Sequence, residues 1–362
     1  MREERLRVLI AGGGTGGHVI PALAVARALV EQFDAEVRFL GTARGLETRL
    51  VPAAGFPLDL VQVGQLNSVA LGTRIRTVAG LPKSILNCVC LLREFRPHVV
   101  FGVGGYASGP AMLAAILTRT PRMAFEPNAV PGMVNRWVGR WVQAAAVNFA
   151  PAARYFRHAT VTGIPVRSEF FSLKLKDRNV APHLLIFGGS QGARILNEKL
   201  PQIAAALLAA VPGLTLLHQC GARHLERTQT AYQQSGAEAS RWQVREFLDD
   251  MPQHFAAASL VLCRSGASTV AELAAAAKPS LLIPFPQAAD DHQRHNAEAL
   301  AQAGAAEVML QRDLTPERLL EHLTRLLQDS DRLAAMDHQA RALAYPNAAQ
   351  EIAAILKRLR RS

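Results

Sequence analysis

Short apolar runs that end in glycine or polar residues alternate along this chain with longer segments whose apolar residues recur at helical spacing. Such runs occupy residues 37–42, 98–105, 122–128, 214–221, 242–248, 260–266 and 279–286. A short run that is apolar throughout is typical of a strand buried on both faces of a parallel sheet. The alternation therefore predicts an α/β protein with helices on both faces of its sheets and ligands outside the carboxyl ends of the strands.

The same opening occurs twice, as RVLIAGGGTGGH at residues 7–18 and as HLLIFGGSQGAR at residues 183–194. Each copy consists of an apolar strand, a glycine loop and a helix that begins with small residues. The second copy begins near the middle of the chain. This internal similarity predicts two related, doubly wound domains.

The boundary between the domains is predicted in residues 161–170, where glycine and proline interrupt regular structure. We therefore expect an N-terminal domain of residues 1–165 and a C-terminal domain of residues 166–344. The last segment, residues 345–362, has the pattern of an amphipathic helix with a basic end. We expect this helix to pack back on the N-terminal domain.

The composition is that of a globular protein, with 49% hydrophobic and 19% charged residues. No apolar stretch is long enough to span a membrane or to act as a signal peptide, so we expect a chain that stays in the cytoplasm. The four cysteines have neither zinc-site nor disulfide spacing. We expect them to be buried, reduced thiols.

The formal net charge of +11 favours an anionic partner, which could be a nucleic acid, an anionic membrane surface or a phosphorylated ligand. No helix-turn-helix, zinc-finger or RNP-type aromatic pattern is present, so we expect no nucleic-acid partner.

The segment GGGTGG, residues 12–17, loosely matches the dinucleotide fingerprint, which is a weak signal by itself. A dinucleotide site also needs an acidic residue at the end of the second strand to hold the ribose. The second strands end in Leu40-Gly41-Thr42 and Gln219-Cys220-Gly221, without an acid. An oxidoreductase is therefore only a minor alternative.

Glycine-rich loops at strand ends recur at residues 12–17, 102–109, 188–192 and 265–268. Exposed N–H groups at the start of a helix, together with the helix dipole, stabilise a phosphate-type anion. Any one of these loops could equally be a tight strand–helix turn without a ligand. Four of them on two similar domains favour phosphorylated ligands.

A set of motifs then occurs in a specific order over nearly the whole chain: GGGTGGH, GVGGYASGP, EPN, GIPVR, GGSQGARILN, EFLDDM, CRSGASTVAEL and DDHQRHNA. This set resembles glycosyltransferase family 28, and in particular its bacterial enzymes of peptidoglycan synthesis. The resemblance implies the GT-B fold, with two Rossmann-like, doubly wound parallel-sheet domains facing a central cleft. It also implies transfer of GlcNAc from UDP-GlcNAc to lipid I, which gives lipid II.

The resemblance implies a donor site mostly in the C-terminal domain. Ser190 matches a contact to the donor diphosphate, Glu272 the carboxylate that holds the ribose diol, and Leu248 the position whose backbone recognises uracil. The backbone of SGAST, residues 265–269, matches the segment that cradles the diphosphate. The candidate residues in this segment and the helix that follows are Ala267, Ser268, Thr269, Val270 and Ala271. Glu272 could instead complement the helix dipole, and Ser190 could be only a helix cap.

Further implied contacts involve the nucleotide and the sugar. Arg167 matches a nucleotide-site arginine, although it could only brace the linker, and Gln293 matches a glutamine that contacts sugar hydroxyls. Asn128 matches an asparagine that reaches the sugar across the cleft, while Thr15, Gly16 and Gly17 form the N-terminal loop. The sequence departs from the family pattern at Phe125, Pro127 and His292, which affects the fine sugar contacts. We expect no cofactor and no metal ion.

His18 lies at the mouth of the first helix and is our candidate for the catalytic base. The implied reaction is a displacement with inversion, in which a base removes the proton of the attacking 4-hydroxyl of MurNAc. Near a helix N-terminus the dipole disfavours the protonated imidazole, so His18 is expected to be a neutral acceptor. The alternative is that His18 only binds the acceptor phosphate or caps the loop.

An acceptor that lies in a membrane requires a docking surface. Residues 69–96 combine basic residues with apolar residues at helical spacing, and Trp137 and Trp141 alternate with arginines. Both patterns are typical of contact with an anionic bilayer, and both could also be ordinary core with a solvated face. We expect a peripheral protein at the cytoplasmic face of the cell membrane.

Two other functions stay open. A GT-B-fold UDP-GlcNAc epimerase, or another nucleotide-sugar enzyme, would need no lipid acceptor and would leave the basic apolar segment without a purpose. A nucleotide-sugar sensor would bind the donor without turnover.

Overall fold

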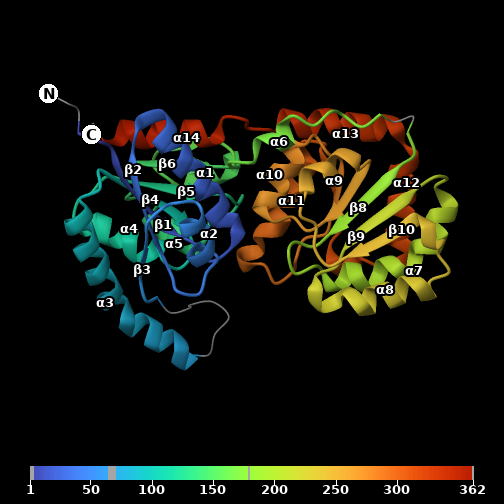
Figure 1. Ribbon diagram of the computed structural model, residues 1–362, viewed down its shortest axis with the longest axis horizontal. Coiled ribbons are helices and arrows are strands. Elements are labelled where there is room, and N and C mark those ends of the chain that lie inside the picture. Colours follow the sequence, from blue (N-terminus) through green and yellow to red (C-terminus); the bar gives the residue numbers. More distant parts are fainter. Residues whose placement is uncertain (1–3, 64–70, 178–179, 361–362) are drawn as a thin grey trace. The chain divides into compact units, whose positions relative to one another are not determined.

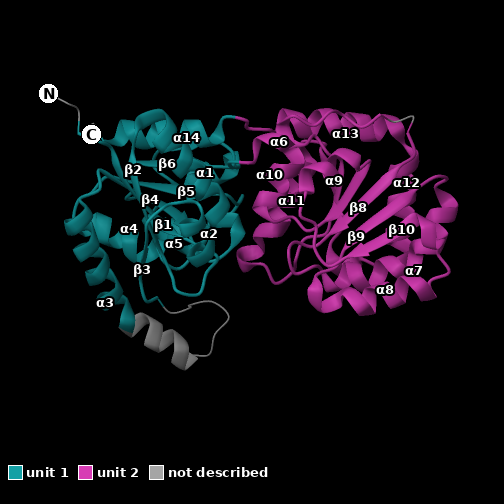
Figure 2. Cartoon of the chain, viewed as in Figure 1, with its two compact units in different colours: residues 1–165, 347–362 teal, residues 166–346 magenta. Residues whose placement is uncertain are grey.

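The computed structural model describes residues 4–63, 71–177 and 180–360, with the backbone alone for residues 71–79. These residues divide into two compact units (Figure 2). Unit 1 comprises the described residues of Met1–Pro165 and Asn347–Ser362, and unit 2 comprises those of Val166–Pro346.

Unit 1 contains a parallel sheet with the strand order β3-β2-β1-β4-β5-β6-β7 in its described part (Figure 1). The strands are β1 Arg7–Gly12, β2 Glu36–Gly41, β3 Leu58–Leu60, β4 Val99–Gly104, β5 Arg122–Glu126, β6 Ala144–Val147 and β7 Ala159–Val161. The central strands are buried over almost their whole length because helices cover both faces of the sheet. The strand order reverses between β1 and β4, where ligands of such sheets bind.

The helices of unit 1 are α1 Gly16–Phe33, α2 Glu47–Ala53, α3 Leu71–Phe95, α4 Ser108–Leu117, α5 Met133–Val138 and α14 Ala348–Leu359. The last of these, α14, comes from the C-terminal segment and packs against α1. Its Lys357 ammonium lies 4.6 Å from the centre of the Phe33 ring. The first and last described helices of the chain therefore share one core.

Unit 2 repeats the plan with a parallel sheet of order β10-β9-β8-β11-β12-β13 in its described part. The strands are β8 His183–Phe187, β9 Thr215–Gln219, β10 Trp242–Arg245, β11 Leu260–Cys263, β12 Ser280–Leu282 and β13 Ala306–Val308. The order reverses between β8 and β11. The loops that follow these two strands are the GGSQGA loop and the SGAS loop.

The helices of unit 2 are α6 Ser168–Phe171, α7 Arg194–Ala210, α8 Leu225–Gln234, α9 Met251–Ala257, α10 Ala267–Ala275, α11 His292–Gln302, α12 Pro316–Gln328 and α13 Ser330–Ala342. The local sequence explains α12 well. Thr315 accepts a hydrogen bond from the Arg318 N–H at 3.3 Å, and Pro316 occupies the first helical position. The leucines at positions 319, 323, 326 and 327 are buried on the face that packs against α7.

The predicted fold class is confirmed, and so are the strands expected from the longer apolar runs. The sequence pattern did not reveal β3, β6, β7 and β13. These strands have three or four residues each, and β6 is Ala-Ala-Ala-Val, so they carry no recognisable period.

The expectation of four buried thiols is wrong for one of them. Cys88, Cys220 and Cys263 are buried, but Cys90 is exposed. Cys88 and Cys90 are two positions apart on α3, about 200° around the helix, so they point in nearly opposite directions. Among the described residues, no helix is long and apolar enough to cross a membrane.

Candidate functional site

In unit 1 the loops that follow β1 and β4 are pressed together at the point where the strand order reverses. The Gly13 N–H donates to the Gly104 carbonyl at 3.2 Å. A Cβ added to Gly12 would lie 2.2 Å from the same carbonyl oxygen, and one added to Gly105 would lie 2.3 Å from the Gly13 oxygen. These glycines are therefore required by contact between the two loops, whereas a Cβ on Gly14 would meet no atom within 4 Å.

His18 lies in the first turn of α1, against the β4 loop. Thr15 is the extended residue that precedes α1, and its hydroxyl lies 3.3 Å from Nδ1 of His18. A Cβ on Gly104 would lie 2.9 Å from Nε2 of His18, so the half-buried ring rests on this glycine. Gly16 and Gly17 form the start of the helix beside it. The loop thus holds the imidazole at the carboxyl edge of the sheet.

Asn128 lies at the same edge, after β5. The buried Glu126 carboxylate accepts bonds from the Asn128 backbone N–H at 2.9 Å and from its side-chain amide at 3.1 Å. Glu126 also accepts from Gly132 N–H at 3.1 Å and from the Asn135 amide at 2.9 Å. Burial raises the pKa of Glu126 in spite of these bonds. The turn that carries Asn128 is therefore built around one buried acid.

In unit 2 the GGSQGA loop leaves a cavity on the β11 side. The loop packs closely against β9, because a Cβ on Gly192 would lie only 1.8 Å from the Cys220 carbonyl oxygen. Ser190 is exposed at its tip. The cavity has a volume of about 570 Å³ and is lined by Gly188, Gly192, Ala193, Arg194, Ile195, Glu198, Arg264, Phe285, Gln287, Gln293 and Gln311. Its size is that of a small-ligand site.

Arg264 connects the walls of this cavity. Its guanidinium donates to the carbonyls of Ile283 and Pro284, both at 3.0 Å, and to the Gln311 side chain at 2.7 Å. Burial lowers the pKa of Arg264 to about 10, so it remains charged at neutral pH. The cavity therefore contains a fixed positive charge.

The start of α10 has the features of an anion site. Gly266 precedes the helix and offers no side-chain cap to its first N–H groups. The Ser268 hydroxyl is buried and has no hydrogen-bond partner among the described residues. Ala267, Thr269 and Ala271 are half-buried around it, and Val270 packs inward. The segment can therefore still accept a polar ligand.

Glu272 follows on α10 in an environment that disfavours its charge. Burial raises the pKa of Glu272 to about 7, while the positive charge of Arg167 acts in the opposite direction. Arg167 is exposed and stacks over the Phe170 ring, with its guanidinium carbon 5.1 Å from the ring centre. Leu248 is 6% exposed and follows β10. The linker arginine and the helix acid thus interact electrostatically.

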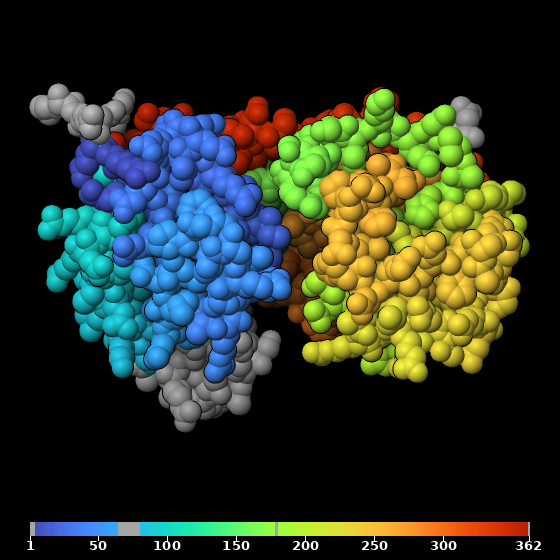
Figure 3. All heavy atoms as spheres, in the orientation of Figure 1, coloured from blue at the N-terminus to red at the C-terminus, as the bar shows by residue number. Residues whose placement is uncertain are grey.

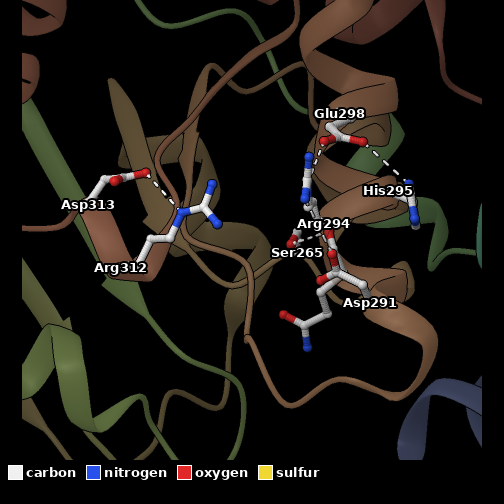
Figure 4. A network of polar contacts seen from close by, with 8 residues as sticks. Ser265, Asp291, Arg294, His295, Glu298, Arg312 and Asp313 are labelled. Atoms are coloured by element: carbon white, nitrogen blue, oxygen red, sulfur yellow. Dashed lines mark hydrogen bonds and ion pairs between the residues drawn. The ribbon is translucent and has the colours of Figure 1, made fainter.

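Gln293 lies in the first turn of α11 and is held from two sides. Its carbonyl accepts from the buried Ser265 hydroxyl at 2.7 Å, and its side-chain oxygen accepts from the Phe285 N–H at 3.0 Å. Figure 4 shows Ser265 pointing at this turn, beside the ion pairs of Arg294 with Asp291 and Glu298. His292 Nδ1 lies 2.6 Å from the Ala289 carbonyl, which orients its ring within the same turn.

The candidate residues are divided between the two units. Thr15, Gly16, Gly17, His18 and Asn128 lie at the carboxyl edge of the unit 1 sheet, and the others belong to unit 2. Sequence reasoning did not single out Glu47, Glu126 or Arg264, although two of them lie inside quoted motifs. Within the described residues, no group of three or more His, Cys, Asp or Glu side chains is placed to hold a metal ion.

This architecture, two Rossmann-like units with glycine loops where the strand order reverses, defines a protein of the GT-B fold. Residues 8–147 match the glycosyltransferase family 28 N-terminal domain, and residues 183–353 match the family's C-terminal domain. The chain belongs to glycosyltransferase family 28.

The relatives are similar over nearly their full lengths. Proteins of Syntrophotalea carbinolica and Solibacter usitatus are 43% and 44% identical, covering 96% and 98% of this chain and 97% and 96% of their own. Both are named UDP-N-acetylglucosamine--N-acetylmuramyl-(pentapeptide) pyrophosphoryl-undecaprenol N-acetylglucosamine transferase. The crystal structure of Acinetobacter baumannii MurG matches with a TM-score of 0.81 and 33% identity, covering 98% of this chain and 99% of that one.

A UDP-GlcNAc 2-epimerase from Neisseria meningitidis, solved with UDP-GlcNAc, shares the fold with a TM-score of 0.68. It covers 98% of this chain and 100% of that one, but the identity is 14%, so this likeness concerns the fold alone.

Proposed function

We propose that this protein transfers GlcNAc from UDP-GlcNAc to the 4-hydroxyl of MurNAc in lipid I, giving lipid II for peptidoglycan synthesis. The proposal is carried by full-length similarity to transferases of that name, together with the uncapped N–H groups and the Ser268 hydroxyl at the start of α10. The fold is shared with epimerases at only 14% identity, so the epimerase alternative is not favoured.

On the donor side, the diphosphate is proposed to bind the first N–H groups of α10 and the Ser268 hydroxyl. These groups meet the negative charge that develops on the leaving UDP, which is a large part of such a barrier. Glu272 is proposed to hold the ribose diol through its carboxylate, whose ionised form Arg167 favours. Gln293 and the Arg264 cavity form the proposed sugar side.

On the acceptor side, His18 is proposed as the base that removes the proton of the attacking hydroxyl. The ring is oriented by the Thr15 hydroxyl and by the surface of Gly104. General-base catalysis of this kind contributes about 10²–10⁴-fold. The attack inverts the configuration at the GlcNAc anomeric carbon, and UDP leaves with the bonding electron pair. No step requires a metal ion, because fixed donors stabilise the leaving group.

The test is UDP release from UDP-GlcNAc in EDTA, with and without a lipid I analogue. Acceptor-dependent release, with a β-1,4-linked disaccharide product, would support the transferase. UDP-ManNAc formed without acceptor would replace it with the epimerase. Tight UDP-GlcNAc binding with neither product would replace it with the sensor.

We further propose that α3, α4 and α5 dock unit 1 on an anionic bilayer at the cytoplasmic face. Helix α4 contacts both α3 and α5. Large apolar side chains are exposed on each of these three helices, and one more is exposed shortly after α5. Exposures are 63% for Leu86, 69% for Leu117, 72% for Trp137 and 59% for Trp141. The outer surface of described α3, drawn in cyan, is open to solvent (Figure 3).

The sequence prediction for residues 69–96 needs correction in part. Ile85 and Val89 pack against the core of unit 1, so they do not face a membrane. Residues 69 and 70, and the side chains of 71–79, lie outside the described part. The exposed basic residues that remain on α3 are Lys83 and Arg93. The tryptophans, each next to an exposed arginine, now carry most of the proposal.

Co-sedimentation with vesicles that contain anionic lipid tests this docking. The double variant Trp137→Ser/Trp141→Ser should bind at least about tenfold more weakly, since even one such side chain contributes roughly 1.5–3 kcal/mol when fully removed from water. Leu175→Ser, which removes an exposed apolar residue from unit 2, is the matched control and should bind as the wild type does. Unchanged binding of the double variant would contradict the docking surface.

A further inference from the structure

The glycine loop of unit 1 is attached to a buried acid that the mechanism above does not use. Glu47, the first residue of α2, is 1% exposed. One carboxylate oxygen accepts the Gly14 N–H at 2.7 Å. The other accepts both the N–H and the hydroxyl of Thr42 at 2.9 Å. A single carboxylate therefore joins the loop after β1 to the loop after β2.

Three glycines make room for this carboxylate. A Cβ added to Gly13, Gly41 or Gly45 would lie 2.4, 2.5 or 1.9 Å from Glu47 side-chain atoms. The Leu46 N–H also donates to the Gly14 carbonyl at 3.3 Å, which adds a second link between the two loops. Side chains at these three positions would clash with Glu47. The position of Glu47 therefore constrains the path of both loops.

The carboxylate is ionised although it is buried. Burial opposes the charge, but hydrogen bonds from Gly14 and Thr42 outweigh it and hold the pKa of Glu47 below its ordinary value. The described residues include no ion-pair partner for it. An N–H group that this carboxylate occupies is also unavailable to a ligand phosphate, so Gly14 does not serve as a free anion donor.

The hydrogen bond between Gly14 and Glu47 lies one residue before Thr15, in the loop that leads to His18. Gly14 is followed by Thr15, whose hydroxyl contacts His18, and Gly13 is tied to Gly104 on the other side. The loop is therefore held between two fixed neighbours, the Gly104 carbonyl and the Glu47 carboxylate. Loss of the second would free the segment that sets the place of His18.

We propose that Glu47 is a positioning residue for acceptor-side catalysis, which holds the Gly12–Gly17 loop and His18 in their working geometry. This inference rests on the proposed transfer to lipid I. The glycines of this loop then have a structural role, which is to make room for the Glu47 carboxylate, in addition to any contact with substrate.

The test compares Glu47→Gln with Thr42→Val in the purified full-length protein. In Glu47→Gln an NH₂ group must face either Gly14 N–H or the two Thr42 donors, so one anchor is lost. Thr42→Val removes one bond to the same carboxylate and keeps the Gly14 anchor, which makes it the matched control. Both are assayed for kcat and KM with a lipid I analogue and for UDP-GlcNAc binding without acceptor.

We expect acceptor kcat/KM of Glu47→Gln to fall on the order of 10²-fold, the cost of misplacing a catalytic group by about 1 Å. UDP-GlcNAc binding should be unchanged. The fall in acceptor kcat/KM of Thr42→Val should be less than about a fifth of that of Glu47→Gln. In a His18→Ala background the further loss from Glu47→Gln should largely disappear, because the two residues act through one loop. Glu47→Asp, which keeps the charge but shortens the reach, replaces the Gln variant if that one fails to fold.

Three results would overturn the inference: unchanged or improved acceptor kinetics in Glu47→Gln, an equal loss of donor binding, or an equal cost with and without His18. Failure of the wild-type protein to transfer GlcNAc would instead refute the proposed function, so the two failures are distinguishable.

Discussion

Glu272 offers a sharp test of the donor site, because its environment sets its charge close to neutral pH. Burial raises the pKa of Glu272 to about 7, with Arg167 opposing the shift. If the ribose diol binds the carboxylate, only the ionised form binds tightly. About one molecule in eleven is ionised at pH 6 and about ten in eleven at pH 8, so the dissociation constant should rise about tenfold between pH 8 and pH 6.

The assay is calorimetric titration with UDP-GlcNAc, whose phosphodiester groups do not titrate in this range. Glu272→Gln should bind about 10- to 150-fold more weakly at pH 8, which corresponds to about 1.5–3 kcal/mol for a hydrogen bond to a charged group. It should also lose the pH dependence between pH 6 and 8. Arg167→Ala should move the wild-type profile to higher pH. A pH-independent wild-type affinity, or a Gln variant with the wild-type profile, would refute this reasoning.

Two further predictions concern histidines. His18→Ala should lower kcat about 10²–10⁴-fold in the acceptor-dependent UDP-release assay, with donor binding unchanged; a variant that retains wild-type kcat would exclude His18 as the base. His218 is fully buried between Asn197 and Tyr232, and burial lowers its pKa to about 3. The unfolded chain takes up a proton below about pH 6.5 and the folded protein does not, so its contribution to stability is complete above that pH and declines below it. Urea unfolding at pH 7.5 and 5 should show this decline, and His218→Gln should reduce it; identical slopes for both proteins would contradict it.

Much of the fold followed from the chain's pattern, because parallel strands buried on both faces leave continuous apolar runs. The repeated glycine openings predicted two related domains, and in the structure both openings follow strands at which the strand order reverses. Ser190, Ser268 and Gln293 became candidates through the family resemblance, and they lie after β8, β11 and β12 of the unit 2 sheet. The missed strands β3, β6, β7 and β13 have only three or four residues each, too few to show a period.

What the sequence did not reveal are the acids and the arginine that support these loops. Glu47 follows Gly45-Leu46 at the start of a short helix, where many surface acids also occur, and only the coordinates show that Gly13, Gly41 and Gly45 surround it. Arg264 stands inside a recognised motif, yet its partners Ile283 and Gln311 are distant in sequence. Such contacts depend on which loops meet in space, and no local spacing encodes that.

The return of α14 to unit 1 has a consequence for biosynthesis. Unit 2 is continuous in sequence, whereas unit 1 is completed only by a helix that the ribosome makes after all of unit 2. At typical synthesis rates of about 5–20 residues per second, the N-terminal segment waits roughly 10–40 seconds for its last helix. During that interval the apolar face of α1 that α14 will cover is exposed. A chain truncated before residue 347 and released from the ribosome should therefore contain all of unit 2 but expose this face of α1 to chaperones.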